Sequence, residues 1–453
     1  MSRVYRSGCV IGRRYLGSLR RPDLDLDAYS RTVDQFRDIC ARRKVPFPLE
    51  TYTALYEQLR TARARAGQLK REAGVLQRQM KASKAGKEVV DEQYVLAQLA
   101  ALKPVLKSVD ETQQGILSQL RAMAEQLPNL ISDDSREQQQ LVEYINTDGQ
   151  VDLTPQETFD HKSILEKAGL VEFARAANVS GRGWYYLLGD MALLEQALVQ
   201  YSLKLARKAG FQMAIPPSIV RTEITSACGF KPRDTNNERQ VYELTHDNLC
   251  LTGTAEIPLA ALSIESEYKL AELPRRLVGV SRSYRAEAGA AGRNTRGLYR
   301  VHEFTKVELF CWTAGDVDAS NAEFDRLVEF QKQFVSSLGL PVRVLIMPWD
   351  DLGAPAFKKI DIEAYMPGRG SWGEVSSTSN CLDYQSRRLH ARYRDEKNKL
   401  KFVHTLNGTA CAVPRVLLAL VENNYDPKTQ TIAIPDVLQP YMDDKSIIDC
   451  HCK

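Results

Sequence analysis

Hydrophobic residues recur at alternating spacings of four and three in two runs between residues 55 and 127. Their members are Leu55, Leu59, Ala62, Ala66, Leu69, Ala73, Leu76 and Met80, and then Leu99, Leu102, Leu106, Val109, Ile116, Leu120, Met123 and Leu127, with Gln113 as the one polar member. This spacing is typical of a coiled-coil seam. Because a short polar link at residues 81–87 joins the runs, we predict an antiparallel helical hairpin over about 50–128. Pro104 should kink the second helix or mark where it begins.

Basic residues dominate the first predicted helix. Between residues 51 and 87 there are nine basic side chains and two acidic ones, a local charge of +7 in a chain whose net charge is +4. Such a helix attracts phosphate backbones, although a solvated coiled-coil face explains the charge equally well. The candidate nucleic-acid contacts are Arg60, Arg63, Lys70, Arg71, Arg78 and Lys81.

The rest of the chain suggests further segments. A chain of 453 residues is long enough for two or more domains. We expect an N-terminal domain at 23–132 that includes the hairpin, a polar linker at 133–160, the main domain at 161–440 with a helix over 193–208, and a loose tail at 441–453.

The first 22 residues contain six arginines and no acidic residue, with interspersed serines and aliphatic residues. This composition is typical of a mitochondrial transit peptide, so we expect a matrix location. A basic N-terminal extension, and with it a cytoplasmic location, is the alternative. The nine cysteines are irregularly spaced, which favours reduced thiols. No apolar stretch reaches the roughly 18 residues of a membrane span, so we expect no membrane partner.

Three segments of the main domain combine charged and small residues. Residues 282–310 hold an Arg-, Gly- and Ala-rich loop followed by a strand-like run, in which Phe304, Lys306 and Glu308 share one face. Such a strand suits a site for a charged small molecule, although an edge hairpin with solvated charges is the alternative. Glu374–Asn380 offers hard oxygen ligands of the kind that Mg²⁺ prefers. Residues 404–415 suggest a strand end, a glycine turn and a helix beginning near Pro414.

Together these segments resemble motifs 2 and 3 of class II aminoacyl-tRNA synthetases, in the form found in bacterial and mitochondrial seryl-tRNA synthetases. The matching sequences are Arg-Ala-Glu-Ala-Gly at 285–289, Arg-Val-His-Glu-Phe at 300–304, Lys-Val-Glu at 306–308, Leu-Asn-Gly-Thr at 406–409 with Arg415, and Thr-Ala-Glu at 254–256. Pro217 resembles the motif 1 proline of the dimer interface. The resemblance implies an α+β fold, with a six- or seven-stranded antiparallel sheet, flanking helices and a tRNA-binding coiled-coil arm.

The resemblance also implies an activity: ATP and Mg²⁺ activate L-serine as seryl-adenylate, and a homodimer transfers the serine to tRNA-Ser. The implied catalytic residues are Arg285, Glu374 and Arg415. The implied ATP contacts are Arg285, Ala286, Glu287, Val301, His302, Glu303, Phe304, Glu374, Val375, Ser376, Ser377 and Arg415. Phe304 is expected to stack on the adenine with Arg415 over its other face, and Glu374 and Ser377 to hold Mg²⁺.

The implied serine contacts are Thr254, Ala255, Glu256, Arg285, Glu308, Asn407 and Thr409. A pocket that hydrogen-bonds a hydroxyl rejects alanine strongly, because its buried polar groups would otherwise lose a partner. The division of the ammonium and the hydroxyl between Glu256 and Glu308 stays open at this point.

Some positions depart from the family pattern, which usually has Gln at Glu303 and Ser at Ala286 and Thr378, and glycines where Ala410, Cys411 and Pro414 stand. None of these changes removes a charged catalytic group. Two rival interpretations remain: a non-catalytic tRNA-binding paralogue, and a ligase that charges a carrier protein. The first should have lost site charges, and the second should lack the arm.

Overall fold

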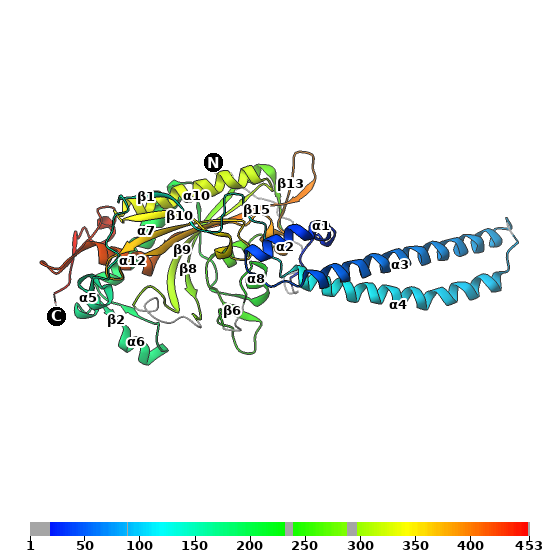
Figure 1. The fold of residues 1–453 in the computed structure, drawn as a ribbon, viewed down its shortest axis with the longest axis horizontal. Coiled ribbons are helices and arrows are strands. Elements are labelled where there is room, and N and C mark those ends of the chain that lie inside the picture. The colour runs from blue at the N-terminus through cyan, green and yellow to red at the C-terminus, as the bar shows by residue number, and fades with distance from the viewer. Residues whose placement is uncertain (1–18, 88, 232–238, 288–296, 452–453) are drawn as a thin grey trace, which may run out of the picture.

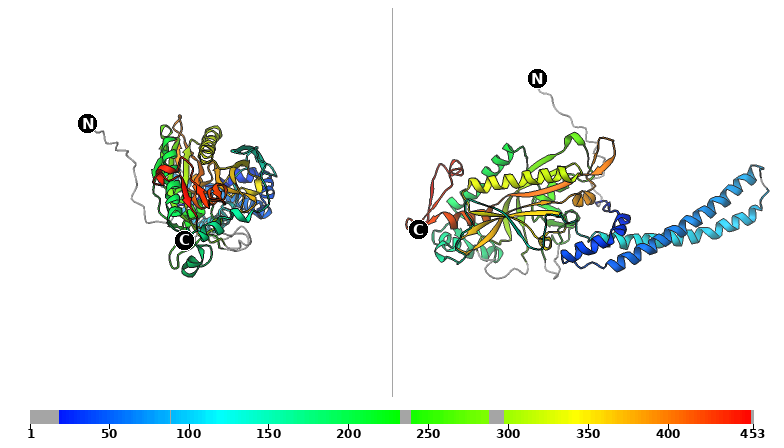
Figure 2. Two further views of the ribbon diagram at one scale, coloured as in Figure 1. Left: turned by 90° about the vertical axis from the view of Figure 1, so that its left-hand side faces the viewer. Right: turned by 45° about the horizontal axis from the view of Figure 1, so that its top comes forward.

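The computed structural model describes residues 19–87, 89–231, 239–287 and 297–451. A body built on an eight-stranded sheet carries a long helical hairpin that projects from one end (Figure 1). The last described residues lie at the opposite end of the body, and a second view shows the same separation (Figure 2). The predicted α+β fold with a helical arm is confirmed.

The arm consists of α3 (Leu49–Lys84) and α4 (Glu92–Ala124). Leu59, Leu69 and Leu120 of the predicted seam are almost fully buried. Gln113, the polar break in the seam, donates from Nε2 to the Ala62 carbonyl at 3.1 Å, so its amide is satisfied across the hairpin. Pro104 lies inside α4 and does not mark where this helix begins.

The base of the arm is fixed to the body by buried polar contacts. Two short helices, α1 (Leu26–Arg31) and α2 (Val33–Arg42), pack with the arm's base in one hydrophobic core. Arg43 donates to the carbonyls of Gly353 and Ala356 at 3.1 and 2.6 Å. Asn129 donates to the carbonyl of Cys381 at 2.7 Å. These contacts join the arm and the body because buried polar groups must keep their partners.

The main sheet has the strand order β1-β10-β11-β12-β15-β9-β8-β4, and all neighbours are antiparallel except β4 and β8. The strands are β1 (Gln140–Ile145), β4 (Gln212–Ala214), β8 (Arg275–Tyr284), β9 (Glu303–Thr313), β10 (Val342–Ile346), β11 (Lys358–Met366), β12 (Ser371–Asn380) and β15 (His404–Ala412). The expectation of six or seven strands is therefore too low, because β1 at one edge comes from the segment predicted to be a linker.

Helices cover the two faces of this sheet with separate cores. α7 (Asp190–Lys208), α10 (Val317–Ser337) and α12 (Val413–Asn424) share the larger core. α8 (Thr222–Ala227), α9 (Glu256–Ala261) and α11 (Tyr384–Leu389) contribute to the second core. On β9, Val307 and Leu309 face the first core, whereas Phe310 and Trp312 face the second. Phe304, Lys306 and Glu308 therefore lie on the face that holds the second core, as the alternation predicted.

Smaller elements complete the body. They are α5 (His161–Lys167), α6 (Phe173–Ser180), β2 (Val171–Glu172), β3 (Tyr186–Leu187), β5 (Ile219–Arg221), β6 (Leu249–Leu251), β7 (Glu267–Lys269), β13 (Arg392–Arg394), β14 (Leu400–Phe402), β16 (Tyr425–Asp426), β17 (Thr431–Ala433) and β18 (Ile447–Asp449), with 3₁₀ turns at Glu157–Phe159, Leu270–Glu272, Trp349–Asp351 and Gln439–Tyr441.

Several boundaries differ from the expectations. β18 pairs with β17 and Cys450 is buried, so the segment from 441 to 451 is no loose tail. Residues 404–412 form one strand that runs through Gly408, so the predicted glycine turn is wrong. The segment 19–22 of the predicted presequence contacts the body, since the Leu19 N–H donates to Glu223 at 3.1 Å. Residues 1–18 lie outside the described part.

Candidate active site

A pocket opens on the sheet face that carries Phe304 and Lys306, beside the first turn of α12. It encloses about 490 Å³, including space that is open to solvent. It is lined by Arg285, Glu287, Leu298, Tyr299, Arg300, Val301, Phe304, Lys306, Glu374, Val375, Thr409, Ala412, Pro414 and Arg415. Eight of the predicted site residues are in this set: Arg285, Glu287, Val301, Phe304, Glu374, Val375, Thr409 and Arg415.

Two arginines dominate the pocket. The Arg285 guanidinium lies 5.2 Å from the ring centroid of Phe304, and Nε of Arg285 donates to the Gly253 carbonyl at 3.4 Å. Arg415 lies over the ring of Tyr299 at 4.6 Å and donates to the Tyr299 carbonyl at 3.3 Å. A planar guanidinium both stacks on aromatic rings and binds phosphate or carboxylate in a forked geometry. The pair therefore suits a ligand that is both flat and anionic.

Glu374 stands opposite these arginines, and Arg415 Nη1 lies 3.2 Å from its carboxylate. Burial alone would raise the pKa of Glu374, but the charges of Arg415, Lys359 and Arg285 outweigh it and hold this pKa below its ordinary value. Burial, together with the charge of Arg415, lowers the pKa of Arg285. Two cations this close to each other favour an additional anion between them.

A β-bulge in β12 brings Glu374 and Ser377 onto one face. Glu374 is opposite Glu363 and Ser377 is opposite Asp361 on β11, with a register shift between them. Residues three apart on a regular strand would face opposite sides, so the bulge is what places both oxygens together. Asp361 is 3 % exposed, and burial together with the charge of Glu374 raises its pKa to about 7. This donor set of a carboxylate, a hydroxyl and a neighbouring carboxyl fits Mg²⁺.

A second, more enclosed group lies next to the arginine pair. Lys306 Nζ is 2.6 Å from the Glu308 carboxylate and donates to the Thr254 hydroxyl at 3.0 Å. Glu256, the first residue of α9, accepts from Gln385 Nε2 at 2.7 Å. Glu256, Glu308 and Thr254 are all buried, with exposed fractions of 6, 1 and 1 %.

The two glutamates of this group hold their protons unusually strongly. Burial and the charge of Glu308 raise the pKa of Glu256 to about 7. Burial also raises the pKa of Glu308, against the lowering effects of Lys306 and Arg285. The charge of one lysine acts on both buried carboxylates, and a bound ammonium would further stabilise both ionised forms.

Other predicted residues contribute through the backbone or lie elsewhere. The carbonyl of His302 accepts from the N–H of Arg285 at 2.9 Å, and the His302 ring stacks on Trp184. Glu303 pairs with Arg282 at 2.9 Å and lies on the opposite strand face from Phe304, so its side chain is not part of the pocket. Ala286 donates its N–H to the Gln240 carbonyl.

The remaining predicted residues are also structural in their observed contacts. The Ser376 hydroxyl donates to the Thr409 carbonyl at 2.6 Å. Asn407 is opposite Phe310 and contacts the sulfur of Cys381 at 3.7 Å. Ala255 is fully buried directly before α9. None of the three lines the pocket.

The predicted site omits several residues that the structure adds, among them Tyr299, Lys306, Asp361 and Gln385. Lys306 was identifiable, because it shares a strand face with Phe304 and Glu308. Asp361 becomes a neighbour only through the β11–β12 pairing, and Gln385 only through the packing of α11 on α9. Cross-strand and helix-to-helix neighbours of this kind leave no spacing signal in the sequence.

On the arm, the six predicted contacts share one flank of α3. At 3.6 residues per turn, positions 60, 63, 70, 71, 78 and 81 fall within an arc of about 100° on one side of the helix. Their side chains are exposed. Arg60, Arg63 and Lys70 form ion pairs with Glu57, Asp27 and Asp110, respectively. No ion pair is recorded for Arg71, Arg78 or Lys81 within the described residues.

The helices and the cysteines show two general features of the described structure. Within the described residues, no helix combines the length and apolarity that a membrane crossing requires. The seven cysteines from Cys40 to Cys450 in the described segments are free thiols, and all are buried. Cys9 and Cys452 lie outside those segments.

Family models match two parts of the chain. Residues 24–131 match the seryl-tRNA synthetase N-terminal domain, and residues 240–424 match the tRNA synthetase class II core domain (G, H, P, S and T). A structural comparison finds similarity to the crystal structure of seryl-tRNA synthetase from Pyrococcus horikoshii complexed with ATP. That match has a TM-score of 0.83 and 29 % identity, and covers 94 % of this chain and 99 % of the other.

Curated proteins give the same picture. The serine–tRNA ligase of Rubrobacter xylanophilus is 34 % identical over 92 % of this chain and 97 % of its own length. The mitochondrial serine–tRNA ligase of Saccharomyces cerevisiae is 56 % identical over 64 % of this chain, and that match spans 65 % of the relative's length. The match to the mitochondrial enzyme of Schizosaccharomyces pombe spans 59 % of that relative. The chain thus covers less than two thirds of these two relatives.

Proposed function

The chain belongs to the seryl-tRNA synthetase family, and from this premise we propose that it activates L-serine with ATP and transfers the serine to the 3′ end of tRNA-Ser. The observation that carries the proposal is the junction of two sites. An arginine pair that suits a flat anionic ligand adjoins a buried Lys306, Glu308 and Glu256 group that suits a small ammonium ligand. An amino acid and a nucleotide would meet where these sites join.

Adenylate formation needs two anions to be held together while pyrophosphate leaves in line with the attack. Arg285 lies between the two sites, so its fork bridges the serine carboxylate and the α-phosphate. Phe304 and Arg415 flank the adenine, which requires the Arg285 guanidinium to move in part from the ring of Phe304. Charge that develops on the leaving pyrophosphate is stabilised by these fixed cations.

Mg²⁺ would be held by Glu374 and Ser377, with Asp361 as their neighbour. The ion supplies charge neutralisation to the phosphates. The lowered pKa of Glu374 keeps its carboxylate ionised, as a metal ligand must be. The solved relatives support the nucleotide itself, since one is complexed with ATP and another, the cytoplasmic enzyme of Naegleria fowleri, with AMP.

Serine selection rests on the ammonium and the hydroxyl. Glu256 takes the ammonium in this proposal, because burial and the charge of Glu308 raise its pKa and a bound ammonium would stabilise its ionised form. Glu308 and Thr409 then take the hydroxyl. Alanine would leave these buried acceptors without a donor, at a cost of about 1–3 kcal/mol. Threonine must be excluded by the space that its methyl group needs.

The second step requires tRNA, and the exposed basic flank of α3 supports an interaction with its backbone. A helix reads RNA mainly by shape and phosphate position. Arg71, Arg78 and Lys81 extend from the helix without recorded ion pairs in the described structure, so they can bind phosphates at little cost of lost contacts.

A homodimer and a mitochondrial location complete the proposal. Met213 and Ile215 are 45 and 88 % exposed beside Pro217, so an apolar edge at motif 1 is available for a second copy. Mitochondrial relatives and the arginine-rich N-terminus support import into the matrix. A presequence that ends before Leu19 would preserve the contacts of residues 19–22 with the body.

The rival functions are less well supported. A non-catalytic paralogue would not need these site charges, and here Arg285 interacts electrostatically with Glu308, Glu374 and Arg415. A carrier-protein ligase would not need the arm, which here carries a basic flank.

The test is ATP–pyrophosphate exchange by the full chain with serine, alanine or threonine. We expect exchange with serine that exceeds exchange with alanine by at least about tenfold, because of the unpaired acceptors. Folded protein that exchanges with none of the three would contradict the proposal and favour the non-catalytic paralogue.

A further inference from the structure

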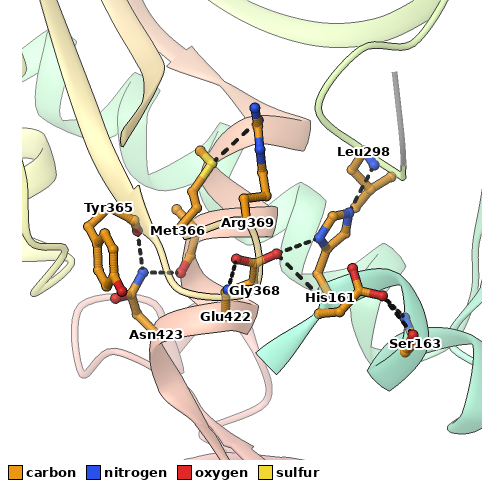
Figure 3. A network of polar contacts seen from close by, with 11 residues as sticks. His161, Ser163, Leu298, Tyr365, Met366, Gly368, Arg369, Glu422 and Asn423 are labelled. Atoms are coloured by element: carbon orange, nitrogen blue, oxygen red, sulfur yellow. Dashed lines mark hydrogen bonds and ion pairs between the residues drawn. The ribbon is translucent and has the colours of Figure 1, made fainter. Parts of the chain in front are cut away.

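A buried histidine–glutamate pair links three segments next to the pocket. His161 begins α5 and Glu422 lies in the last turn of α12, and each is 1 % exposed. His161 Nδ1 is 2.7 Å from Glu422 Oε1, while the N–H of Leu298 donates to His161 Nε2 at 3.1 Å (Figure 3). The other oxygen of Glu422 accepts from the N–H of Gly368 at 2.8 Å. The pair thus touches two loops as well as two helices.

The hydrogen bonds define the protonation of the ring. Because Nε2 accepts from a backbone N–H, it carries no hydrogen, and the single ring proton must be on Nδ1, which donates to Glu422. Asp160 lies close enough to suggest a metal cluster with this pair. Both ring nitrogens already have partners, however, and Asp160 caps α5 by accepting from the backbone N–H of Ser163 at 3.2 Å and from its hydroxyl at 2.6 Å. The arrangement is that of a polar bridge.

The bridge reaches the nucleotide side of the pocket through Tyr299. Leu298 lines the pocket, and the Tyr299 carbonyl that follows it accepts from Arg415. The ring of Tyr299 lies between two guanidinium groups, those of Arg369 at 3.6 Å and Arg415 at 4.6 Å. Arg369 follows Gly368, the other backbone partner of the bridge. Both loops that hold Tyr299 are therefore tied to His161 and Glu422.

Gly297 shows how closely this loop approaches the histidine. Its φ is 65°, and a Cβ atom there would lie 2.1 Å from His161 Nε2. Any other residue would displace either the ring or the loop. The approach is needed for the Leu298 N–H to reach the ring.

We propose that His161 and Glu422 are positioning residues for nucleotide binding, which set the place of residues 298–301 and, through Tyr299, of Arg415. This inference rests on the proposed function, since it assigns ATP to the pocket. It assigns the bridge no role toward serine: Thr254, Glu256 and Glu308 lie on other elements and have no recorded contact with the bridge. A bridge that only stabilises the fold would affect the two substrates alike.

The experiment compares His161→Phe with the unchanged full chain. Phenylalanine keeps a flat ring, which is slightly larger than imidazole, and removes both side-chain hydrogen bonds. We expect the Kd for Mg-ATP, measured by titration calorimetry, to rise by at least about fivefold, and the KM for serine in pyrophosphate exchange to change by less than about twofold. Ser163→Ala is the matched control, because it alters the same helix start without touching Leu298 or Glu422.

His161→Gln tests whether restoring the two hydrogen bonds restores ATP binding. An amide carries one donor and one acceptor at about the separation of the two ring nitrogens, so it can bond Glu422 and Leu298 together. We expect it to restore ATP affinity to within about twofold of the unchanged protein. If His161→Phe does not fold, as judged by circular dichroism, His161→Gln and Glu422→Gln carry the test.

Glu422→Gln must place an NH₂ group against either Gly368 N–H or the ring proton, so it should weaken ATP binding as well. Because both residues act through one bridge, the variant that combines His161→Phe with Glu422→Gln should bind Mg-ATP no more weakly than the weaker-binding single variant. Equal changes for ATP and serine, or unchanged ATP affinity in folded His161→Phe and Glu422→Gln, would overturn the inference. A chain that binds Mg-ATP but never exchanges with serine would contradict the proposed function and leave the bridge test standing.

Discussion

The arm and the pocket both depend on charge, but they hold it differently. On the arm, Lys70 and Asp110 pair at 3.5 Å with side chains 62 and 50 % exposed. In the pocket, Lys306 and Glu308 pair at 2.6 Å with side chains 10 and 1 % exposed. Exposed charges are screened by salt, whereas buried charges interact strongly and shift one another's pKa. Substitutions of single arm charges should therefore have small, additive effects on tRNA binding, whereas the loss of one pocket charge should strongly reduce activity.

The largest expected effect is that of Arg285→Ala. Because this guanidinium lies between the nucleotide and the amino-acid sites, its loss should lower kcat/KM in pyrophosphate exchange by a factor on the order of 10²–10³. Arg285→Lys keeps the charge without the forked guanidinium, so its kcat/KM should lie between that of the alanine variant and that of the unchanged protein. The affinity for tRNA should stay unchanged in both variants. An alanine variant with more than about a tenth of the original exchange would contradict the assignment.

Glu256→Gln is expected to raise the KM for serine by about 10- to 100-fold, because a charged hydrogen bond to the ammonium is lost. With a pKa near 7, Glu256 gains a proton as the pH falls from 8 to 6, so the KM for serine of the unchanged protein should rise over this range. In the variant this dependence should flatten. A rise of equal size in the variant would assign it to another group, such as Asp361.

The raised pKa of Glu256 also predicts a stability effect. The folded protein binds a proton at Glu256 that the unfolded chain, with a carboxyl pKa near 4.5, releases earlier. Through this group, the free energy of unfolding should decline as the pH rises from about 4.5 to 7. Denaturant titrations at several pH values check the sign. Glu256→Gln should remove this part of the decline, and an unchanged profile would contradict the shift.

A moderate effect is expected from Arg71→Ala combined with Arg78→Ala on the arm. The Kd for tRNA should rise about tenfold, and the slope of log Kd against log salt should fall by about 1–2, as two phosphate contacts are lost. Exchange without tRNA should be unaffected. Lys103→Ala combined with Lys107→Ala on α4 is the control of equal charge. If both double variants lost tRNA affinity equally, the arm would attract tRNA by its overall charge and not through a defined flank of α3.

The smallest effect is expected from Asp110→Asn. This change breaks the exposed pair with Lys70, and the free energy of unfolding should change by less than about 0.5 kcal/mol. Thermal unfolding at low and high salt measures it. A loss several times larger would mean that ion pairs hold the arm together and that its apolar seam does not suffice.

The same contrast explains what the sequence could predict. The arm depends on local periodicity, and its two helices and seam followed from spacing alone. β9 was also predictable, since its alternation places Phe304, Lys306 and Glu308 together. Asp361, Tyr299 and the His161–Glu422 bridge come from segments far apart in the chain, which only strand register and helix packing bring together.

One difference from the expectations has the same origin. The edge strand β1 lies in the segment predicted to be a linker, because it is short and half polar and its pairing partner β10 lies far along the chain. Glu303 stays a predicted ATP contact, and the structure adds that alternation along β9 directs its side chain to Arg282.

The most direct test of the division between arm and pocket is to measure serine-dependent exchange and tRNA serylation in parallel on the Arg71→Ala, Arg78→Ala variant. We predict exchange within about twofold of the unchanged protein, and a fall of about tenfold in kcat/KM for tRNA. If exchange and serylation fell together, or if serylation were unchanged, the arm would not be a separate tRNA-binding region.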